Sequence, residues 1–147
     1  MFYTAPDRAT CLPAPESFAA LTQPGRGRGY GTIDVVRAYQ LGPAHAGEAF
    51  YASDEFEQKT WRLQVQPDGS LTGGRLFAEE GEAGVTTDAA GRVYVCAGQV
   101  FVYDRDGRLV DRIDVPERPS AVVFGGADRR TLFIAARSSL YAWKPAP

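Results

Sequence analysis

The chain has 147 residues and a mass of 15.9 kDa, enough for one domain with an ordinary hydrophobic core. Hydrophobic residues make up 44% and charged residues 23%, which is typical of a soluble globular protein. The formal net charge of -2 argues against a general nucleic-acid binder or a protein held on anionic membranes, because both need a basic surface.

The sequence shows no targeting or membrane-spanning segment. No apolar run is long enough to cross a bilayer, and the first residues lack a basic region followed by an apolar stretch. We therefore expect a cytoplasmic protein in which Cys11 and Cys96 stay reduced. Cys96 lies inside "VYVCAG", where a small buried residue fits, so it is expected to be a core thiol. His45 is the only histidine, which excludes a multi-histidine metal site.

The chain divides near residue 31. Residues 1–31 contain Pro6, Pro13, Pro15 and Pro24 and have no regular pattern, so we expect an irregular N-terminal segment. Residues 32–147 show the alternation and turn chemistry of short β-strands and are expected to form the folded domain.

The predicted strands follow one another closely along residues 32–147. In "TWRLQVQ" (60–66), Trp61, Leu63 and Val65 alternate with polar residues, which indicates a strand with one buried face. Turns are predicted at "PDGS" (67–70) and "RDGR" (105–108), since Asp-Gly pairs favour tight turns. The other predicted strands are "TIDVVRAY" (32–39), "AFYASD" (49–54), "SLTGGRLFAEE" (70–80), "GVTTD" (84–88), "RVYVCA" (92–97), "GQVFVYD" (98–104), "RLVDRIDV" (108–115), "SAVVFGG" (120–126), "TLFIAAR" (131–137) and "SSLYAWK" (138–144).

Similar strands recur about every 40 residues. Phe50, Val93 and Leu132 begin similar apolar strands and are separated by 43 and 39 residues. Periods of about 40 residues with about four short strands each are typical of β-propeller blades. We predict an all-β fold, a partial β-propeller of about three four-stranded antiparallel blades. A closed ring needs about four blades or more. The chain is therefore part of a longer protein, assembles with other chains, or closes as a smaller irregular sheet.

Residues 32–144 resemble the SMP-30/gluconolactonase/LRE-like family. The resemblance rests on "FGGADRRTLFIAAR" (124–137), on the D-x-x-G-x-V-Y-V run of residues 88–95, and on "FYASDEFEQKTWRLQVQPDGSL" (50–71). It implies a six-bladed propeller with one divalent cation, usually calcium, in its central channel and hydrolysis of lactones or phosphotriester-like substrates. The family holds its cation with a glutamate of the first blade, an asparagine of a P-N-G segment and an aspartate of a P-D-G segment.

The family's cation ligands carry over poorly to this sequence. The first-blade glutamate has no counterpart in the matching residues, and the sequence contains no asparagine. Ala83 and Gly84 stand where the family has Asp-Gly, and alanine offers no side-chain oxygen. Glu82 lies one residue earlier and is the candidate ligand for Ca²⁺ or another divalent cation, with a solvated loop glutamate as the alternative.

Three further residues are candidates for a site. Asp54 ends "AFYASD", where family strands direct a polar residue toward the channel; with Glu55 it could meet a cation or a substrate hydroxyl. Arg137 ends "TLFIAAR" and could bind a carboxylate or stabilise developing negative charge, and a salt bridge to a neighbouring blade is the alternative. We therefore consider Asp54 and Arg137 as catalytic candidates, Glu55 and Arg137 as substrate-binding candidates, and Asp54 with Glu82 as metal candidates.

The remaining acidic residues have structural interpretations. Asp68, Asp88 and Asp106 are expected to accept backbone N–H groups in turns, and Glu79 and Glu80 to lie in water at the end of a strand. Two functions stay open beside a third interpretation, a truncated or degenerate copy whose exposed blade edges promote association. The chain is a gluconolactonase-like propeller module without complete lactone-hydrolase machinery of its own, or a calcium-dependent lactone or ester hydrolase whose missing ligands come from another segment or chain. The expected partners are a small lactone or sugar-like ligand and, for assembly, other copies of the chain.

Overall fold

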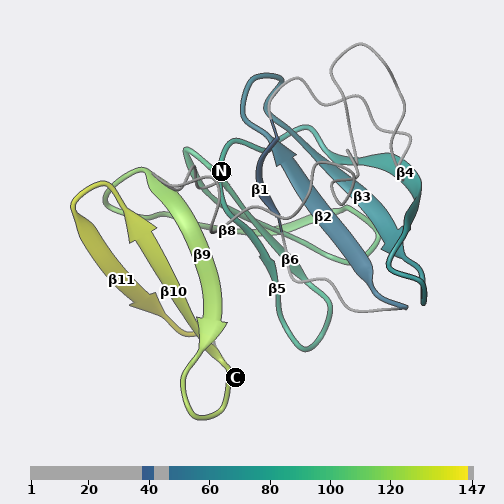
Figure 1. Ribbon diagram of the computed structural model, residues 1–147. Helices are drawn as coiled ribbons and strands as arrows, with labels where there is room; N and C mark the ends of the chain where they lie inside the picture. The colour runs from purple at the N-terminus through teal and green to yellow at the C-terminus, as the bar shows by residue number, and fades with distance from the viewer. Residues whose placement is uncertain (1–37, 42–46, 146–147) are drawn as a thin grey trace, which may run out of the picture.

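The computed structural model describes residues 38–41 and 47–145, and these form eleven β-strands and no helix (Figure 1). The expected irregular segment 1–31 and the residues Cys11 and His45 lie outside the described residues. Only the end of the strand predicted at 32–39 falls within them. No helix in the described part of the chain has the length and apolar character needed to cross a membrane.

The strands form three antiparallel sheets, which we call the first, second and third blades. The first blade has the order β1-β2-β3-β4, with strands Ala38–Leu41, Ala49–Asp54, Lys59–Val65 and Leu71–Ala78. The second has the order β5-β6-β7-β8, with strands Val85–Thr87, Val93–Ala97, Gln99–Tyr103 and Leu109–Ile113. The third has the order β9-β10-β11, with strands Pro119–Gly125, Thr131–Ala136 and Ser139–Trp143.

The three blades fan out around their first strands. Strand β5 contacts β1 and β2 on one side and β9 on the other, so the first strands of consecutive blades lie next to one another. Figure 1 shows the three sheets side by side in chain order. This arrangement confirms the predicted all-β partial propeller. The third blade has three strands in the described residues, at the positions of the three strands predicted at 120–126, 131–137 and 138–144.

Both faces of the second blade are apolar, which explains why it lies between two others. One face, with Val85, Val93 and Val95, packs against Tyr51 and Phe77 of the first blade. The opposite face carries Ala83, Tyr94, Cys96, Val100 and Val102, and packs against the third blade at Val122, Leu132 and Ile134. A sheet that is apolar on both faces is stable only when both are covered.

An aromatic ring links each of the first two blades to the next. Tyr94 is fully buried, and its ring lies edge-on to Phe124 of the third blade with 4.9 Å between the ring centroids. Tyr51 holds the equivalent position one repeat earlier and packs in the contact between the first and second blades. Phe133 holds the equivalent position in the third blade, where no further blade follows in the described residues.

Cys96 belongs to the same contact and is the expected core thiol. Its side chain is fully buried, and burial raises the pKa of this thiol to about 12. Reaction of a cysteine requires the thiolate, so Cys96 is chemically inert in the folded protein.

A close backbone approach brings the second and third blades together at Gly84. A Cβ atom there would lie 2.7 Å from the Cα of Ala121 and 2.9 Å from the backbone nitrogen of Val122. The Gly84 N–H also donates to the Ser120 carbonyl oxygen at 3.1 Å. Glycine at this position therefore allows the two blades to share a backbone hydrogen bond.

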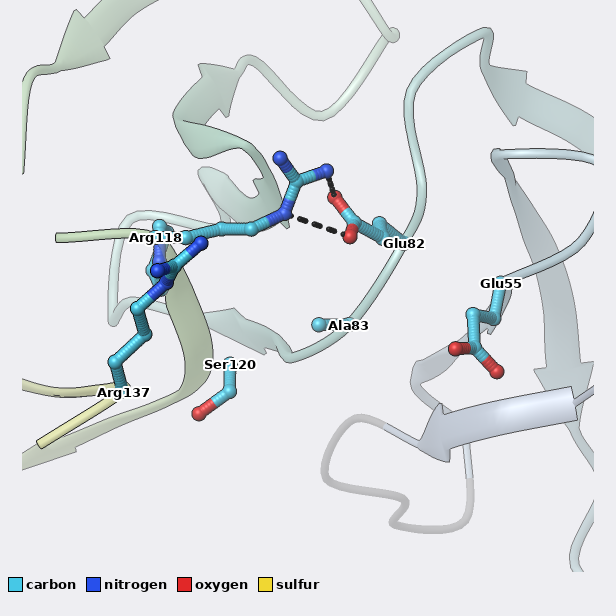
Figure 2. Close-up of a pocket in the computed structure, with 7 residues that line it drawn as sticks. Glu55, Glu82, Ala83, Arg118, Ser120 and Arg137 are labelled. Carbon is cyan, nitrogen blue, oxygen red and sulfur yellow. Dashed lines mark hydrogen bonds and ion pairs between the residues drawn. The ribbon is translucent and has the colours of Figure 1, made fainter.

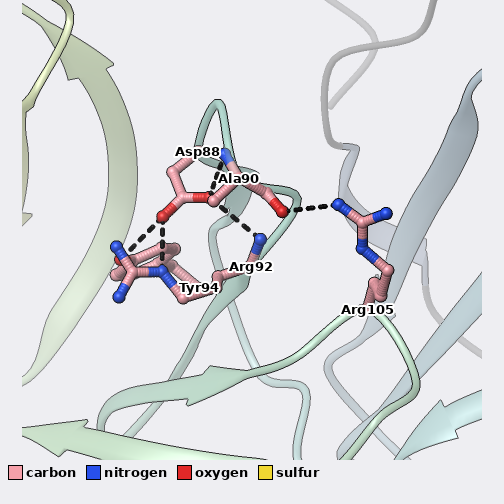
Figure 3. A network of polar contacts seen from close by, with 5 residues as sticks. All are labelled: Asp88, Ala90, Arg92, Tyr94 and Arg105. Carbon is pink, nitrogen blue, oxygen red and sulfur yellow. Dashed lines mark hydrogen bonds and ion pairs between the residues drawn. The ribbon is translucent and has the colours of Figure 1, made fainter.

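Asp88 organises the turn before β6, as expected. Its carboxylate accepts the backbone N–H groups of Ala90 and Arg92, both at 2.9 Å. It also accepts the Arg92 Nε–H at 2.7 Å and the Tyr94 hydroxyl at 3.2 Å (Figure 3). Arg105 donates to the Ala90 carbonyl at 2.8 Å, which joins this turn to the turn after β7.

At the turn after β7 the capping residue differs from the prediction. Asp104, not Asp106, accepts the backbone N–H groups of Asp106 and Arg108, both at 2.9 Å. The pattern matches that of Asp88, because an aspartate at the first turn position reaches the amides two and four residues further on. Asp68 caps its own turn as predicted by accepting the Ser70 N–H at 3.0 Å.

We expect Tyr94→Leu to reduce the free energy of unfolding by about 3 kcal/mol, because it removes a buried ring from the contact between two blades. The matched control is Tyr94→Phe, which keeps the ring, loses only the hydroxyl bond to Asp88 and should cost about 1 kcal/mol. Urea denaturation of the three proteins measures both changes. Equal losses in the two variants would contradict the role given to the ring.

Candidate functional site

A hollow of about 230 Å³ opens at one end of the blades. It is lined by loop and strand-end residues from all three blades, namely Glu55, Glu82, Ala83, Arg118, Pro119, Ser120 and Arg137 (Figure 2). Glu55 follows β2, and Glu82 and Ala83 precede β5. The hollow is somewhat smaller than the roughly 300–1,000 Å³ of drug-sized ligand sites, so it suits a small polar ligand.

Glu82 and Arg118 form a two-point ion pair on one wall of the hollow. The Arg118 Nε–H donates to one carboxylate oxygen at 2.9 Å, and its terminal nitrogen donates to the other at 2.6 Å (Figure 2). This pairing raises the pKa of Arg118 above its ordinary value. Both oxygens of Glu82 are therefore engaged by a guanidinium group, in an ion pair that is partly exposed to solvent.

Arg137 lies in the tight turn between β10 and β11. The pair Ala136–Ser139 closes this hairpin, so only two residues form the loop. Arg137 has φ of 37°, in the left-handed region that glycine normally occupies in such turns. In Figure 2 its side chain extends along the wall of the hollow toward Arg118, opposite Glu55.

Glu117 holds the Arg137 turn in place. Its carboxylate accepts the backbone N–H of Ser138 at 3.1 Å and the hydroxyl of Ser139 at 2.9 Å. These bonds favour the ionised carboxylate and hold the pKa of Glu117 below its usual value. Strained backbone persists where neighbouring contacts fix it and is often found at functional sites. The turn therefore marks Arg137 as a residue of interest.

Arg137 makes no ion pair or hydrogen bond through its side chain within the described residues, in contrast to Arg118. Its guanidinium is exposed at the hollow. It also lies close enough to Glu117 to contribute to the lowered pKa of that carboxyl. A guanidinium group in this setting can bind a carboxylate or other planar anion through two parallel hydrogen bonds.

Asp54 lies beside the hollow and does not line it. Its side chain is fully buried, and one carboxylate oxygen accepts the backbone N–H groups of Phe56 and Glu57 at 3.0 and 3.1 Å. This is the geometry of an aspartate that caps a turn. The neighbouring Ser53 donates its hydroxyl to the Ala83 carbonyl at 2.6 Å and so ties the first blade to the loop before β5.

The other acidic residues of this region are divided between solvent and the blades. Glu79 is exposed, as expected. Glu80 accepts a hydrogen bond from the Tyr103 hydroxyl, so it joins the first blade to the second and does not simply lie in water. Burial and this bond together raise the pKa of Tyr103 above its ordinary value.

The model of the SMP-30/gluconolactonase/LRE-like region matches residues 41–138, which is more than half of the sequence. The chain belongs to this family. A comparison with curated proteins found no match.

Solved structures share the fold at low sequence identity. A gluconolactonase from Xanthomonas campestris is 24% identical with a TM-score of 0.62 over 75% of this chain and 38% of its own. A calcium-binding protein, regucalcin, from Agrobacterium tumefaciens is 23% identical with a TM-score of 0.60 over 69% of this chain and 38% of its own. A luciferin-regenerating enzyme is 16% identical with a TM-score of 0.61 over 72% of this chain and 39% of its own. The chain thus spans about two fifths of the length of these relatives.

The described residues do not fit the cation that the family implies. Among them, no three His, Cys, Asp or Glu side chains lie together in a way that could hold a metal ion. Ala83 lines the hollow without a side-chain oxygen, and Glu82 is paired with Arg118. A hard cation needs about six oxygen ligands, several of them carboxylates. In this hollow the positive charge beside Glu82 comes from a guanidinium group.

The structure brings three of the four candidate residues to one hollow. Glu55, Glu82 and Arg137 line it, and Asp54 lies next to it. Sequence reasoning missed Arg118. A signal for it exists in the repeat, because Glu82 and Arg118 are 36 residues apart and both precede the first strand of a blade. Loops one repeat apart meet at the same end of neighbouring blades.

We expect Arg137→Gly to raise the free energy of unfolding by about 1 kcal/mol, because glycine adopts the left-handed conformation without strain. Arg129→Gly is the matched control, since Arg129 also has a positive φ, of 53°, but does not line the hollow. It should stabilise the protein to a similar degree. Denaturant titrations give both values, and a loss of stability in Arg137→Gly would show that its side chain supports the fold.

Proposed function

We propose that this chain is a gluconolactonase-like propeller module that binds a small lactone or sugar-like ligand in the hollow of Glu82, Arg118 and Arg137. Its described residues do not supply a set of ligands for calcium-dependent lactone hydrolysis. The observation that carries the proposal is the ion pair between Glu82 and Arg118 beside Ala83. It places a fixed cationic group next to the carboxylate that would otherwise be the candidate metal ligand.

The ligand chemistry follows from the side chains of the hollow. Arg137 offers guanidinium donors to a carboxylate or to the carbonyl oxygen of a lactone, and the Ser120 side chain also lines the hollow. Glu55 on the opposite side is an acceptor for sugar hydroxyl groups. Arginine stays charged at all ordinary pH values, so such binding needs no metal ion.

A second function is supported by the same carboxylates. Glu55 and Glu82 reach one hollow from different blades, and the chain spans only about two fifths of the related structures. If another segment or chain contributes further oxygen ligands, this hollow could complete a calcium-dependent lactone or ester hydrolase. Glu82 would then have to exchange Arg118 for the cation, whose role would be to polarise the carbonyl group.

We expect the purified 147-residue chain to show no calcium-stimulated hydrolysis of glucono-1,5-lactone above the spontaneous rate. A pH-stat assay with added Ca²⁺, and again with EDTA, measures this directly. Activity that EDTA abolishes would overturn the first function and favour the second. In that case Glu82→Gln should abolish the activity, and Glu79→Gln, on an exposed glutamate away from the hollow, should leave it unchanged.

We expect gluconate to bind the chain in calorimetric titrations with the same affinity in Ca²⁺ and in EDTA. Arg137→Gly should weaken binding about tenfold or more, because it removes a charge-assisted hydrogen bond. Arg129→Gly relieves the same kind of backbone strain at a residue outside the hollow. This variant should therefore bind gluconate like the unmodified protein. Binding that needs Ca²⁺, or that is unaffected by Arg137→Gly, would contradict this assignment.

A further inference from the structure

The segment that joins the second blade to the third reaches the region of the hollow with two neighbouring residues. It runs from the end of β8 at Ile113 to the start of β9 at Pro119. Arg118 pairs with Glu82 in the loop before β5. Glu117, one residue earlier, binds the tight turn between β10 and β11. One short segment therefore contacts both of the loops that lie on either side of it.

Glu117 binds the turn itself and leaves the guanidinium group of Arg137 unbound. One carboxylate oxygen accepts the Ser138 N–H at 3.1 Å, and the other accepts the Ser139 hydroxyl at 2.9 Å. The Ser138 hydroxyl donates to the same carboxylate at 3.2 Å. Among the ion pairs of the described residues, none joins Glu117 to Arg137. The carboxylate therefore anchors the turn and leaves the side-chain donors of Arg137 for a ligand.

The two carboxylates next to the arginines act in different ways. Glu82 accepts two hydrogen bonds from Arg118 and so occupies its guanidinium group. The hydrogen bond from the Ser138 N–H, and to a smaller extent the nearby charge of Arg137, lower the pKa of Glu117. Glu117 is thus an ionised neighbour of Arg137 that takes up none of its N–H groups. Those N–H groups are the donors that a ligand carboxylate needs.

The turn requires an anchor because Arg137 adopts a conformation that arginine disfavours. Its φ of 37° lies in the left-handed region, and it occupies the first position of a two-residue hairpin loop. Glycine is the usual residue where such a loop has a positive φ at this position. Other residues keep this conformation only when surrounding contacts fix it. In the described part of the chain, both donors of Ser138, the next residue, bind Glu117.

We propose that Glu117 is a positioning residue for ligand binding, which fixes Arg137 in the left-handed conformation that directs its guanidinium group along the hollow (Figure 2). This inference rests on the proposed function, in which Arg137 binds an anionic, sugar-like ligand. Without the bonds to Glu117, the turn relaxes toward conformations that arginine prefers. The apparent affinity for the ligand then falls with the fraction of molecules that keep the turn.

The charge of Glu117 and its positioning role predict opposite effects on binding. As a negative charge alone, Glu117 repels an anionic ligand, so its removal would tighten binding. As a positioning residue it favours binding, so its removal would weaken binding. Replacement by glutamine separates the two effects, because the amide keeps an oxygen acceptor for the Ser138 N–H and carries no charge.

Calorimetric titration of gluconate into the full 147-residue chain and its variants tests the proposal. Glu117→Ala should weaken binding about fivefold, because part of the population loses the turn. Glu117→Gln should bind at least as tightly as the unmodified chain. The matched control is Glu79→Ala, on an exposed glutamate that does not line the hollow, and it should leave binding unchanged.

Three outcomes of the titrations would overturn the proposal. The first is binding to Glu117→Ala that equals or exceeds binding to the unmodified chain, since the bonds to the turn would then have no effect on affinity. The second is a Glu117→Gln variant as weak as Glu117→Ala, since the acceptor oxygen would then not be what matters. The third is an equal loss of affinity in Glu79→Ala, since the effect would then not be specific to the turn.

Amide hydrogen exchange gives a readout that needs no ligand. The Ser138 N–H should exchange about tenfold faster in Glu117→Ala, because it loses its acceptor, while the N–H of Leu132 in the buried part of β10 should exchange at an unchanged rate. Unchanged exchange at Ser138 would refute the positioning role whatever the titrations show. Faster exchange at Ser138, together with no gluconate binding even to the unmodified chain, would support the anchoring of the turn and refute the proposed ligand.

Discussion

The structure depends on packing between sheets that are apolar on both faces. A single four-stranded sheet of this kind cannot be stable in water, because one of its faces would always be exposed. The second blade has both of its apolar faces covered, because it lies between the first blade and the third. The buried ring of Tyr94 in one contact and the buried Val93 and Val95 in the other show that this blade is the centre of the fold.

The hollow is a consequence of that packing. Blades that lie side by side bring the loops at one end of their strands together, even when these loops are far apart in sequence. Glu82 and Arg118 meet in this way, and so do Ser53 and the Ala83 carbonyl. The chemistry of the hollow therefore depends on residues from three blades, and none of the blades could form it alone.

Much of the fold could be predicted from the sequence because its signals are local. Alternation in "TWRLQVQ" defines a strand, Asp-Gly pairs define turns, and the period near 40 residues defines blades. The capping role of Asp104 was missed, because composition alone does not show which aspartate of "DRDG" begins the turn. The three strands of the third blade lie where the alternation in residues 120–144 predicted them.

The site was less predictable because its pairings are not local. The identity of each candidate could be read from the sequence, but its partner could not. Glu82 pairs with a residue one repeat away, and Asp54 turns inward to cap its own loop. The left-handed conformation of Arg137 also leaves no mark in the sequence, because arginine is not the residue that such a position favours.

Gly84 has a consequence for the curvature of the whole arrangement. The backbones of the second and third blades touch at this residue, close to the axis around which the blades fan out. Neighbouring blades that meet closely at their inner edges and diverge outward have a wide angle between their sheets. A ring closed by such blades needs fewer of them. A side chain at this position would separate the inner edges, make the two sheets more nearly parallel and give an arc of larger radius. A single missing Cβ atom therefore helps to set how sharply this chain bends.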